Sequence, residues 1–300
     1  MRTSGKGPFD FDVSRRPALP QASGLFVTGT DTEVGKTLIA GAIARRLRRS
    51  GRRIEVFKPA ATGCRRTREG LVSSDAEFLA ACADSRMTLA DITPLRFKAA
   101  LAPNAAAERE RRSVDLEAIF EAYSRVVAAA DVVIVEGVGG LLCPISNDFW
   151  VVHFARMVNL PVVIVARAGL GTINHTLLTL HAARSAGLNV AGVIINRYWI
   201  DPEVREQIAQ SGWEGGTRPD KQRRDSSQPT GAPEDSRYVK GDEDLAMYTN
   251  PAQIAERGRV EVLAIVPEEQ GNSVENLTIG KDTQFAIDQV DWERIIGIED

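Results

Sequence analysis

Hydrophobic residues in this 300-residue chain fall into short continuous runs, separated by longer segments in which they recur every three or four positions. The continuous runs, several rich in Val and Ile, predict strands buried on both faces, as in parallel sheets. We expect strands at 25–27, 54–57, 132–135, 161–166, 189–195 and 260–266. The periodic segments predict helices at about 38–51, 115–129, 172–186, 251–257 and 282–296. This alternation predicts an α/β fold, a doubly wound and mainly parallel sheet flanked by helices.

Two segments do not follow the alternation. Residues 1–23 carry three prolines among charged and polar residues, without the apolar core of a secretory signal, so we expect a flexible N-terminal tail. Between 214 and 244 the only branched aliphatic residue is Val239, so this stretch is expected to be a disordered insertion. The rest of 24–300 is expected to form a single domain.

Composition narrows the possible partners. The 40 acidic and 37 basic residues nearly cancel, which leaves no electrostatic footprint for nucleic acid. Cys64, Cys82 and Cys143 are widely spaced and odd in number, which favours reduced thiols over a disulfide framework or a zinc site. No run approaches the roughly 18 apolar residues that span a bilayer. We therefore expect a cytoplasmic protein that contacts neither nucleic acid nor membrane.

A phosphate-binding pattern follows the first predicted strand. The segment from Gly29 to Thr37 ends in Gly35-Lys36-Thr37, just where helical periodicity begins. In such a loop the backbone N–H groups and the Lys ammonium hold phosphate oxygens, and the Thr hydroxyl can ligate Mg²⁺. Five residues separate the glycines, whereas the common pattern has four, so an ordinary helix start with an exposed lysine is the alternative. The strand before and the amphipathic helix after favour a nucleotide site.

Further polar residues follow other predicted strands. Lys58 comes after 54–57, Glu136 after 132–135 and Asn196 after 189–195. In open α/β sheets ligands bind at this carboxyl edge. An acid at the end of a buried strand is costly unless it meets a cation, so Glu136 is interpreted as a Mg²⁺ ligand, with a hydrogen-bonded structural acid as the alternative.

Two helix starts leave their interpretation open. Ser74-Asp75-Ala76-Glu77 can be a simple capping box, or Asp75 can contribute to a metal site. Thr172 is expected to be the N-cap of the helix that follows the fourth strand, which makes 171–175 suited to an anion. Ordinary capping or packing is the alternative for Asn174 and His175.

These motifs, in this order, resemble the dethiobiotin synthetases, which are ATP-dependent ligases of the P-loop class. The five-residue spacing before Gly35 is that family's own form of the loop. The resemblance extends over 25–199 through Lys58-Pro59, Ser74-Asp75-Ala76, Val135–Gly140 and Gly169–His175. Departures are Thr62, where the family usually has Ser, and Asn104, where it usually has His.

The resemblance implies that 7,8-diaminononanoate, CO₂ and ATP are converted to dethiobiotin, ADP and phosphate, through a carbamate and a carbamic-phosphoric anhydride. It also implies Mg²⁺ as cofactor and a homodimer. The implied catalytic residues are Lys36, Lys58 and Thr32. The implied ATP contacts are Thr30, Asp31, Thr32, Glu33, Val34, Gly35, Lys36, Thr37, Asn196 and Pro267. The implied metal ligands are Thr37, Asp75 and Glu136. The implied substrate contacts are Lys58, Thr62, Gly171, Thr172, Ile173 and Asn174, the helix start acting across the dimer interface.

Two other functions share this fold class. Partitioning or septum-positioning switch ATPases carry a second lysine five residues before the loop lysine, and this chain has Asp31 there. Cobyrinate-type synthetases are normally joined to a glutamine-hydrolysing module, for which the chain after residue 200 leaves no room. Both differences favour the ligase.

Overall fold

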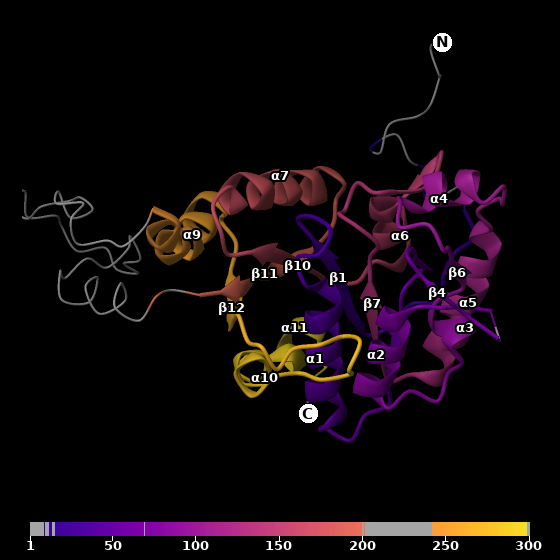
Figure 1. The fold of residues 1–300 in the computed structure, drawn as a ribbon, viewed down its shortest axis with the longest axis horizontal. Coiled ribbons are helices and arrows are strands. Elements are labelled where there is room, and N and C mark those ends of the chain that lie inside the picture. The colour runs from indigo at the N-terminus through magenta and orange to yellow at the C-terminus, as the bar shows by residue number, and fades with distance from the viewer. Residues whose placement is uncertain are drawn as a thin grey trace, which may run out of the picture.

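A single parallel sheet organises the computed structural model, which describes residues 9, 12, 13, 16–68, 70–199, 201 and 242–298 (Figure 1). Its strand order is β12-β11-β10-β1-β7-β2, and every neighbouring pair is parallel. The strands are β1 (Gly24–Gly29), β2 (Ile54–Phe57), β7 (Val132–Glu136), β10 (Val162–Arg167), β11 (Val190–Tyr198) and β12 (Val262–Pro267). The predicted doubly wound, mainly parallel α/β architecture is confirmed.

Helices cover both faces of this sheet (Figure 1). One face packs against α1 (Lys36–Arg48), α2 (Ser74–Ala83), α10 (Lys281–Asp288) and α11 (Trp292–Ile296). The other packs against α5 (Leu116–Ala129), α6 (Val151–Val158), α7 (Thr172–Ser185) and α9 (Asp242–Gly258). None of the helices in the described part of the chain has the length and apolar character needed to cross a membrane.

The apolar runs are continuous because successive side chains of a strand serve different cores. In β1, Leu25 and Val27 belong to the cluster under α1, whereas Phe26 belongs to the cluster under α6 and α7. Strand β7 divides its residues between the two clusters in the same alternating way. A strand with a helix layer on each side therefore has no solvated face on which polar residues would be favoured.

Shorter elements lie between the main ones and bring the remaining chain around the carboxyl edge. Strand β3 (Ala60–Ala61) pairs with β6 (Leu95–Arg96), and two hairpins join β4 (Arg65–Thr67) to β5 (Gly70–Val72) and β8 (Pro144–Ser146) to β9 (Phe149–Trp150). Two short helices are α3 (Leu89–Ile92) and α4 (Pro103–Arg109).

The expected boundaries of the tail and the insertion need correction. Leu19 is buried in the core cluster of the α6 face, so the expectation of a flexible tail over 1–23 is wrong at this position. Helix α9 begins at Asp242, earlier than the predicted 251, so the last three positions of the expected 214–244 insertion are helical. The rest of that insertion lies outside the described residues.

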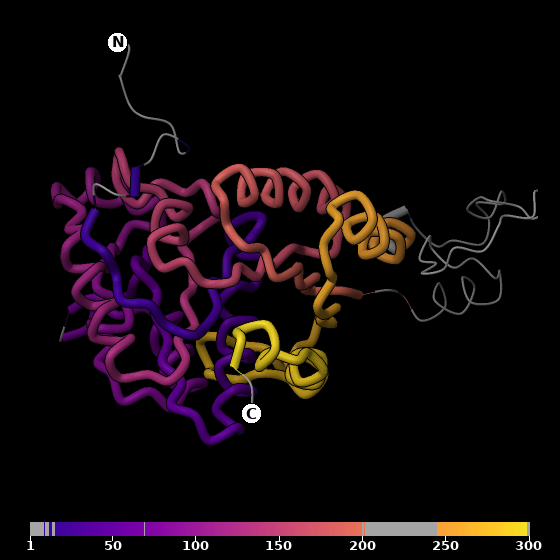
Figure 2. The backbone as a smooth tube through the Cα atoms, turned by 180° about the vertical axis from the view of Figure 1, so that it is seen from behind, coloured from indigo at the N-terminus to yellow at the C-terminus, as the bar shows by residue number. Residues whose placement is uncertain are grey.

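The C-terminal segment is also more integrated than its pattern indicates. The single surface helix expected over 282–296 is wrong, because the chain forms α10 and α11 with a turn between them. Trp292 is fully buried, and its indole Nε1 donates to the carbonyl of Ile287 at 2.8 Å. Figure 2 shows this segment running beside α1, against which α10 packs.

Replacing Trp292 with Ala should therefore destabilise the whole domain, by about 3–5 kcal/mol, because a buried indole leaves a large cavity. Chemical denaturation with global fluorescence and circular dichroism readouts measures this change. The matched control is Phe285→Ala on α10, whose ring is 65% exposed and whose loss should change stability by about 0.5 kcal/mol or less. Equal effects of the two variants would contradict the burial of the C-terminal segment.

Candidate nucleotide-binding site and catalytic centre

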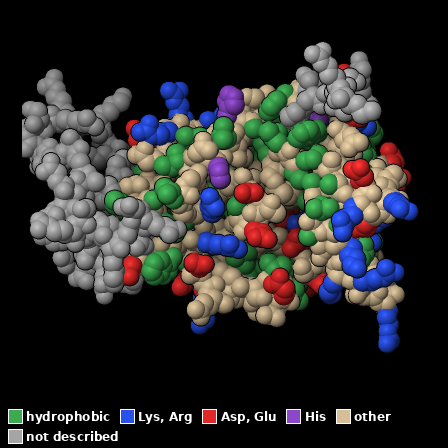
Figure 3. Space-filling view, turned by 45° about the horizontal axis from the view of Figure 1, so that its top comes forward, with side chains coloured by type: hydrophobic (Ala, Val, Ile, Leu, Met, Phe, Trp, Pro, Cys, Tyr) green, Lys and Arg blue, Asp and Glu red, His purple; other side chains and the backbone are tan. Residues whose placement is uncertain are grey.

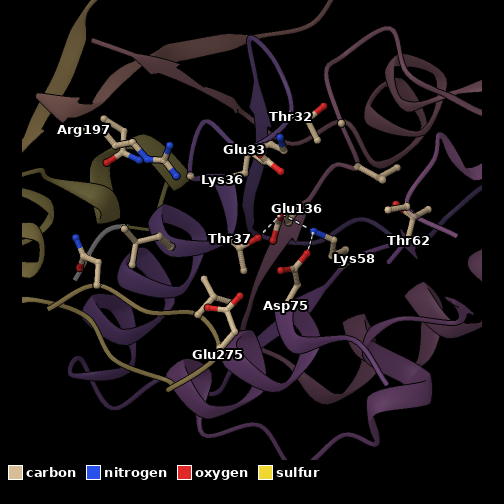
Figure 4. Close-up of a pocket in the computed structure, with 18 of the residues that line it drawn as sticks. Thr32, Glu33, Lys36, Thr37, Lys58, Thr62, Asp75, Glu136, Arg197 and Glu275 are labelled. Carbon is tan, nitrogen blue, oxygen red and sulfur yellow. Dashed lines mark hydrogen bonds and ion pairs between the residues drawn. The ribbon is translucent and has the colours of Figure 1, made fainter. Parts of the chain in front are cut away.

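The cavity at the carboxyl edge of the sheet has a volume of about 860 Å³ (Figure 4). Strands β1, β2, β7, β11 and β12 all end in residues or loops that line it. Eleven of the predicted site residues contribute to its wall: Thr32, Glu33, Gly35, Lys36, Thr37, Lys58, Thr62, Asp75, Glu136, Asn196 and Pro267. Segments far apart in sequence therefore converge as the edge rule for α/β sheets requires.

The loop between β1 and α1 has the conformation that its glycine allows. Gly35 has φ 94°, and a Cβ there would lie 2.0 Å from the side-chain nitrogen of Asn196, so no other residue fits. Lys36 is the first residue of α1, and its Nζ donates to the carbonyl of Asp31 at 2.7 Å. The lysine thus bridges its own loop, with its ammonium at the start of a helix whose N–H groups favour anions.

Opposite this loop, Lys58 lies between two carboxylates. Its Nζ is 2.6 Å from Glu136 Oε1 and 2.7 Å from Asp75 Oδ2 (Figure 4). The register of the sheet explains the first contact, because Phe57 of β2 pairs with Val135 of β7 and the next residue on each strand is Lys58 and Glu136. Helix α2 supplies Asp75 in its first turn.

Glu136 joins this centre to the phosphate-binding loop. Its Oε1 also accepts a hydrogen bond from the Thr37 hydroxyl at 2.9 Å, whereas its Oε2 is buried without a hydrogen-bond partner. A buried acceptor without a partner is costly and is a fitting ligand for a cation. Together with Asp75, these oxygens fit a hard divalent ion. In the described part of the chain, no cluster of three or more His, Cys, Asp or Glu side chains is arranged for a metal.

Burial and charge act in opposite directions on the ionisable groups here. Burial lowers the pKa of Lys36. The negative charge of Glu136, which does not contact Lys36, raises this pKa but offsets the effect of burial only in part. Burial also disfavours the charged form of Lys58, but Glu136 and Asp75 outweigh it and hold the pKa of Lys58 above its usual range. For Asp75 burial is outweighed in turn by the Lys58 ammonium, so the pKa of Asp75 lies below its usual value. Lys58 and Asp75 are therefore an ion pair at neutral pH.

Three of the predicted ATP contacts lie outside the cavity lining: Thr30, Asp31 and Val34. The backbone N–H of Thr30 donates to Val165 of the neighbouring strand at 3.0 Å, so this group is already used by the sheet. Val34 instead helps to position Asn196, which does line the cavity, because the Val34 carbonyl accepts a hydrogen bond from the Asn196 amide at 2.9 Å.

The predicted substrate contacts on α7 are also not part of this cavity. None of Gly171, Thr172, Ile173 and Asn174 is among its lining residues. The N-cap is Gly171, with φ 89°, and the expectation that Thr172 is the N-cap is wrong. Glycine adopts this left-handed conformation without strain, whereas the Thr172 side chain is buried beside Thr176.

Sequence reasoning missed several parts of the wall, among them 100–103, Val138, Gly139 and Cys143, and above all the segment after β12. Glu268, Glu269 and the stretch from Asn272 to Glu275 line the cavity beside Arg197. Val274 and Ile279 pack against Leu38 of α1, which holds this segment over the loop. The signal that could have found it is positional, since the segment directly follows the carboxyl end of a predicted strand.

Comparison with known proteins identifies the family. A family model described as "AAA domain" matches residues 23–275. The ATP-dependent dethiobiotin synthetase BioD of Bacillus subtilis (strain 168) is 41% identical over 184 residues, 61% of this chain and 78% of that protein. The same-named protein of Anaeromyxobacter dehalogenans (strain 2CP-1 / ATCC BAA-258) is 46% identical over 174 residues, 58% and 76% of the two chains. This chain belongs to the ATP-dependent dethiobiotin synthetase family.

Membership confirms the resemblance to this family that the motifs indicated. The MinD cell division protein of Aquifex aeolicus has a TM-score of 0.51 and 12% identity, covering 93% of this chain and 98% of its own. At that identity the likeness shows the fold alone. The family assignment therefore rests on the synthetase relatives.

The ion pair of Lys58 and Asp75 should make part of the stability depend on pH. Because the pKa of Asp75 is lower in the folded protein, its contribution is complete above the unfolded-state value of about 3.9 and is lost as the pH falls through the folded value. The gap in unfolding free energy between wild type and Asp75→Asn should thus be largest near neutral pH and shrink below about pH 4. Urea titrations across this range measure the gap, and a gap that stays constant to pH 3 would contradict the ion pair.

Proposed function

We propose that this protein is an ATP-dependent dethiobiotin synthetase, a ligase that closes a ureido ring on 7,8-diaminononanoate in biotin biosynthesis. The observation that carries the proposal is the convergence of Lys36, Lys58 and the Asp75–Glu136 acid pair on one cavity. Membership of the synthetase family supports the same reaction. The rival switch function has only a fold likeness in its favour.

The reaction has to bring two anions together. One amino group of the diamine adds to CO₂ and loses a proton, giving a carbamate. A carbamate oxygen then attacks the γ-phosphorus of ATP and ADP leaves, which gives a carbamic-phosphoric anhydride. The neighbouring amine attacks the carbonyl carbon, phosphate departs, and the amine proton goes to solvent. Catalysis in this scheme is mainly positioning and neutralisation of negative charge.

The side chains of the cavity suit this task. Lys36 would hold the β- and γ-phosphates once its contact with the Asp31 carbonyl opens, and Thr32 would lie beside the γ-phosphate. Lys58, on the opposite side, would face the carbamate and the transferred phosphoryl group. Thr62 lines the same end of the cavity as Lys58 and would contact the diamine.

Mg²⁺ is the proposed metal, with Thr37, Asp75 and Glu136 as its protein ligands. When bound with ATP it would neutralise charge on the β- and γ-phosphate oxygens. The unpartnered Oε2 of Glu136 and the hydroxyl of Thr37 are hard oxygen donors of the kind that this ion prefers.

The other end of the cavity would receive the base. Asn196 lies near the carboxyl end of β11 and Pro267 ends the neighbouring β12, and Asn196 has a buried Oδ1 without a hydrogen-bond partner. The main-chain N–H groups of the loop from Thr30 to Thr37 would serve the phosphates, except that the N–H of Thr30 is held by Val165 and that of Thr32 would first have to leave the Asp31 carboxylate. ATP would thus lie with its phosphates at the loop between β1 and α1 and its base near the carboxyl ends of β11 and β12.

A homodimer is proposed because the start of α7, where the resemblance implies substrate contacts, does not line the cavity of its own chain. Leu170 and Leu178, before and on α7, are 72% and 60% exposed. Figure 3 shows hydrophobic side chains on the face of the molecule that carries α7. In a dimer joined through this face, the residues from Gly171 to Asn174 would receive the substrate carboxylate of the partner's site.

A cytoplasmic location is proposed as well. It rests on the three cysteines, each of which is free in the described structure.

Neutralising either lysine should abolish ligase turnover without unfolding the protein. We expect Lys36→Gln and Lys58→Gln to lose roughly 10²-fold or more in dethiobiotin formation, because each removes charge stabilisation of the transferred phosphoryl group. Mass spectrometry of the product with diamine, bicarbonate and ATP measures turnover. Lys281→Gln, on the exposed start of α10, is the control and should keep full rate. ATP hydrolysis that proceeds without diamine and CO₂ would instead favour a switch ATPase.

Mixing two inactive variants tests whether α7 serves the partner's site. Lys36→Gln disables a chain's own cavity, and Asn174→Asp places a repelling charge where the partner's substrate carboxylate would bind. Unfolding and refolding an equal mixture should restore roughly a quarter of wild-type activity, because half of the dimers are mixed and each has one intact site. No recovery, with dimers confirmed by light scattering, would mean that both residues act on the same cavity.

A further inference from the structure

The position of Lys58 raises a question about the metal site. Its ammonium contacts both carboxylates proposed as metal ligands, Glu136 Oε1 at 2.6 Å and Asp75 Oδ2 at 2.7 Å. Figure 4 shows the lysine reaching between them. The side chains of Lys58 and Glu136 are only 6% and 1% exposed, so their contact is buried and differs from a surface ion pair, whereas the Asp75 side chain is 35% exposed.

The second lysine of the cavity behaves differently. Lys36 is also nearly buried, but its Nζ donates to the backbone carbonyl of Asp31, and no contact joins it to Glu136 or Asp75. One lysine is therefore bound directly to the two acids, and the other affects them only through space.

The charges of these four groups balance. Lys36 and Lys58 contribute two positive charges, and Asp75 and Glu136 contribute two negative charges. A bare divalent cation entering this cluster would add two uncompensated positive charges next to Lys58, in a site where burial strengthens repulsion. A metal–nucleotide complex instead brings phosphate oxygens, toward which both ammonium groups can turn.

We infer that Lys58 is an internal counter-ion that keeps free divalent cations out of the site, so that the metal enters only together with the nucleotide. When the triphosphate arrives, Lys58 leaves the two carboxylates and its ammonium becomes available to the carbamate and the transferred phosphoryl group. Lys58 is then a specificity-determining residue as well as a catalytic one. The inference rests on the proposed function for the identity of the metal ligands.

Manganese binding, followed by the electron paramagnetic resonance signal of free Mn²⁺, tests this without any turnover. In wild type, Mn²⁺ should bind at least about tenfold more weakly alone than with a non-hydrolysable ATP analogue. Lys58→Met keeps an unbranched side chain, one atom shorter, and removes its charge, and it should tighten nucleotide-free Mn²⁺ binding by about tenfold or more. Lys36→Met removes the same charge without breaking a carboxylate contact, so it should tighten binding several-fold less.

Several results would overturn the inference. Wild type that binds Mn²⁺ equally well with and without the analogue excludes selection of the complex, and this arm needs no variant to fold. If Lys58→Met and Lys36→Met increase the affinity for nucleotide-free Mn²⁺ equally, the increase comes from the change in net charge and not from the carboxylate contacts of Lys58. Gain of binding in Lys58→Met that survives the added Glu136→Gln change would place the ion elsewhere. Absence of dethiobiotin formation would reject the proposed reaction but would leave every Mn²⁺ result standing.

Discussion

The contact of the Lys58 ammonium with Glu136 and Asp75 is the constraint on which the site depends. A buried ammonium is stable only if its partners are held at hydrogen-bonding distance, and here those partners come from different elements. Strand β2 positions the lysine, β7 positions Glu136 beside it through parallel register, and α2 adds Asp75. Removing the lysine would leave the buried Glu136 and the partly exposed Asp75 without the ammonium that contacts both. The position of the Lys58 ammonium in the cavity therefore depends on the register between β2 and β7.

The phosphate-binding loop is joined to the same alignment through a second contact. Asn196, near the carboxyl end of β11, donates to Val34, and Gly35 approaches that amide too closely for any side chain. Thr37, two residues further on, donates to Glu136 on the other side of β1. The loop is thus held from both sides of β1, which keeps its N–H groups oriented without a ligand. Rigid donors of this kind do not have to reorganise as the charge on a transferred phosphoryl group changes.

Local pattern was sufficient for the parts of the molecule that are determined by burial on both faces. The six strands were predicted because continuous apolar runs occur where helices cover a sheet twice, and Lys58, Glu136 and Asn196 were placed correctly because they follow such runs. The C-terminal segment was predicted as a surface helix, and its burial was missed because Trp292 belongs to a core cluster with residues of α1, which is distant in sequence. The position of α7 relative to the cavity was equally hidden, since periodicity identifies a helix but not which molecule its end faces.

The charge around the cavity bears on the proposal that a second chain completes the site. Among the lining residues that the structure describes, the positive side chains are Lys36, Lys58 and Arg197, against six acidic ones: Glu33, Asp75, Glu136, Glu268, Glu269 and Glu275. Lys36 and Lys58 are occupied by phosphate and carbamate in the proposed reaction, and Arg197 lies at the Asn196 end with the proposed base. A substrate that carries a carboxylate then meets no free cation within its own chain's cavity. The first N–H groups of a helix favour anions, and the helix start proposed for this role is that of α7, which lies outside that cavity.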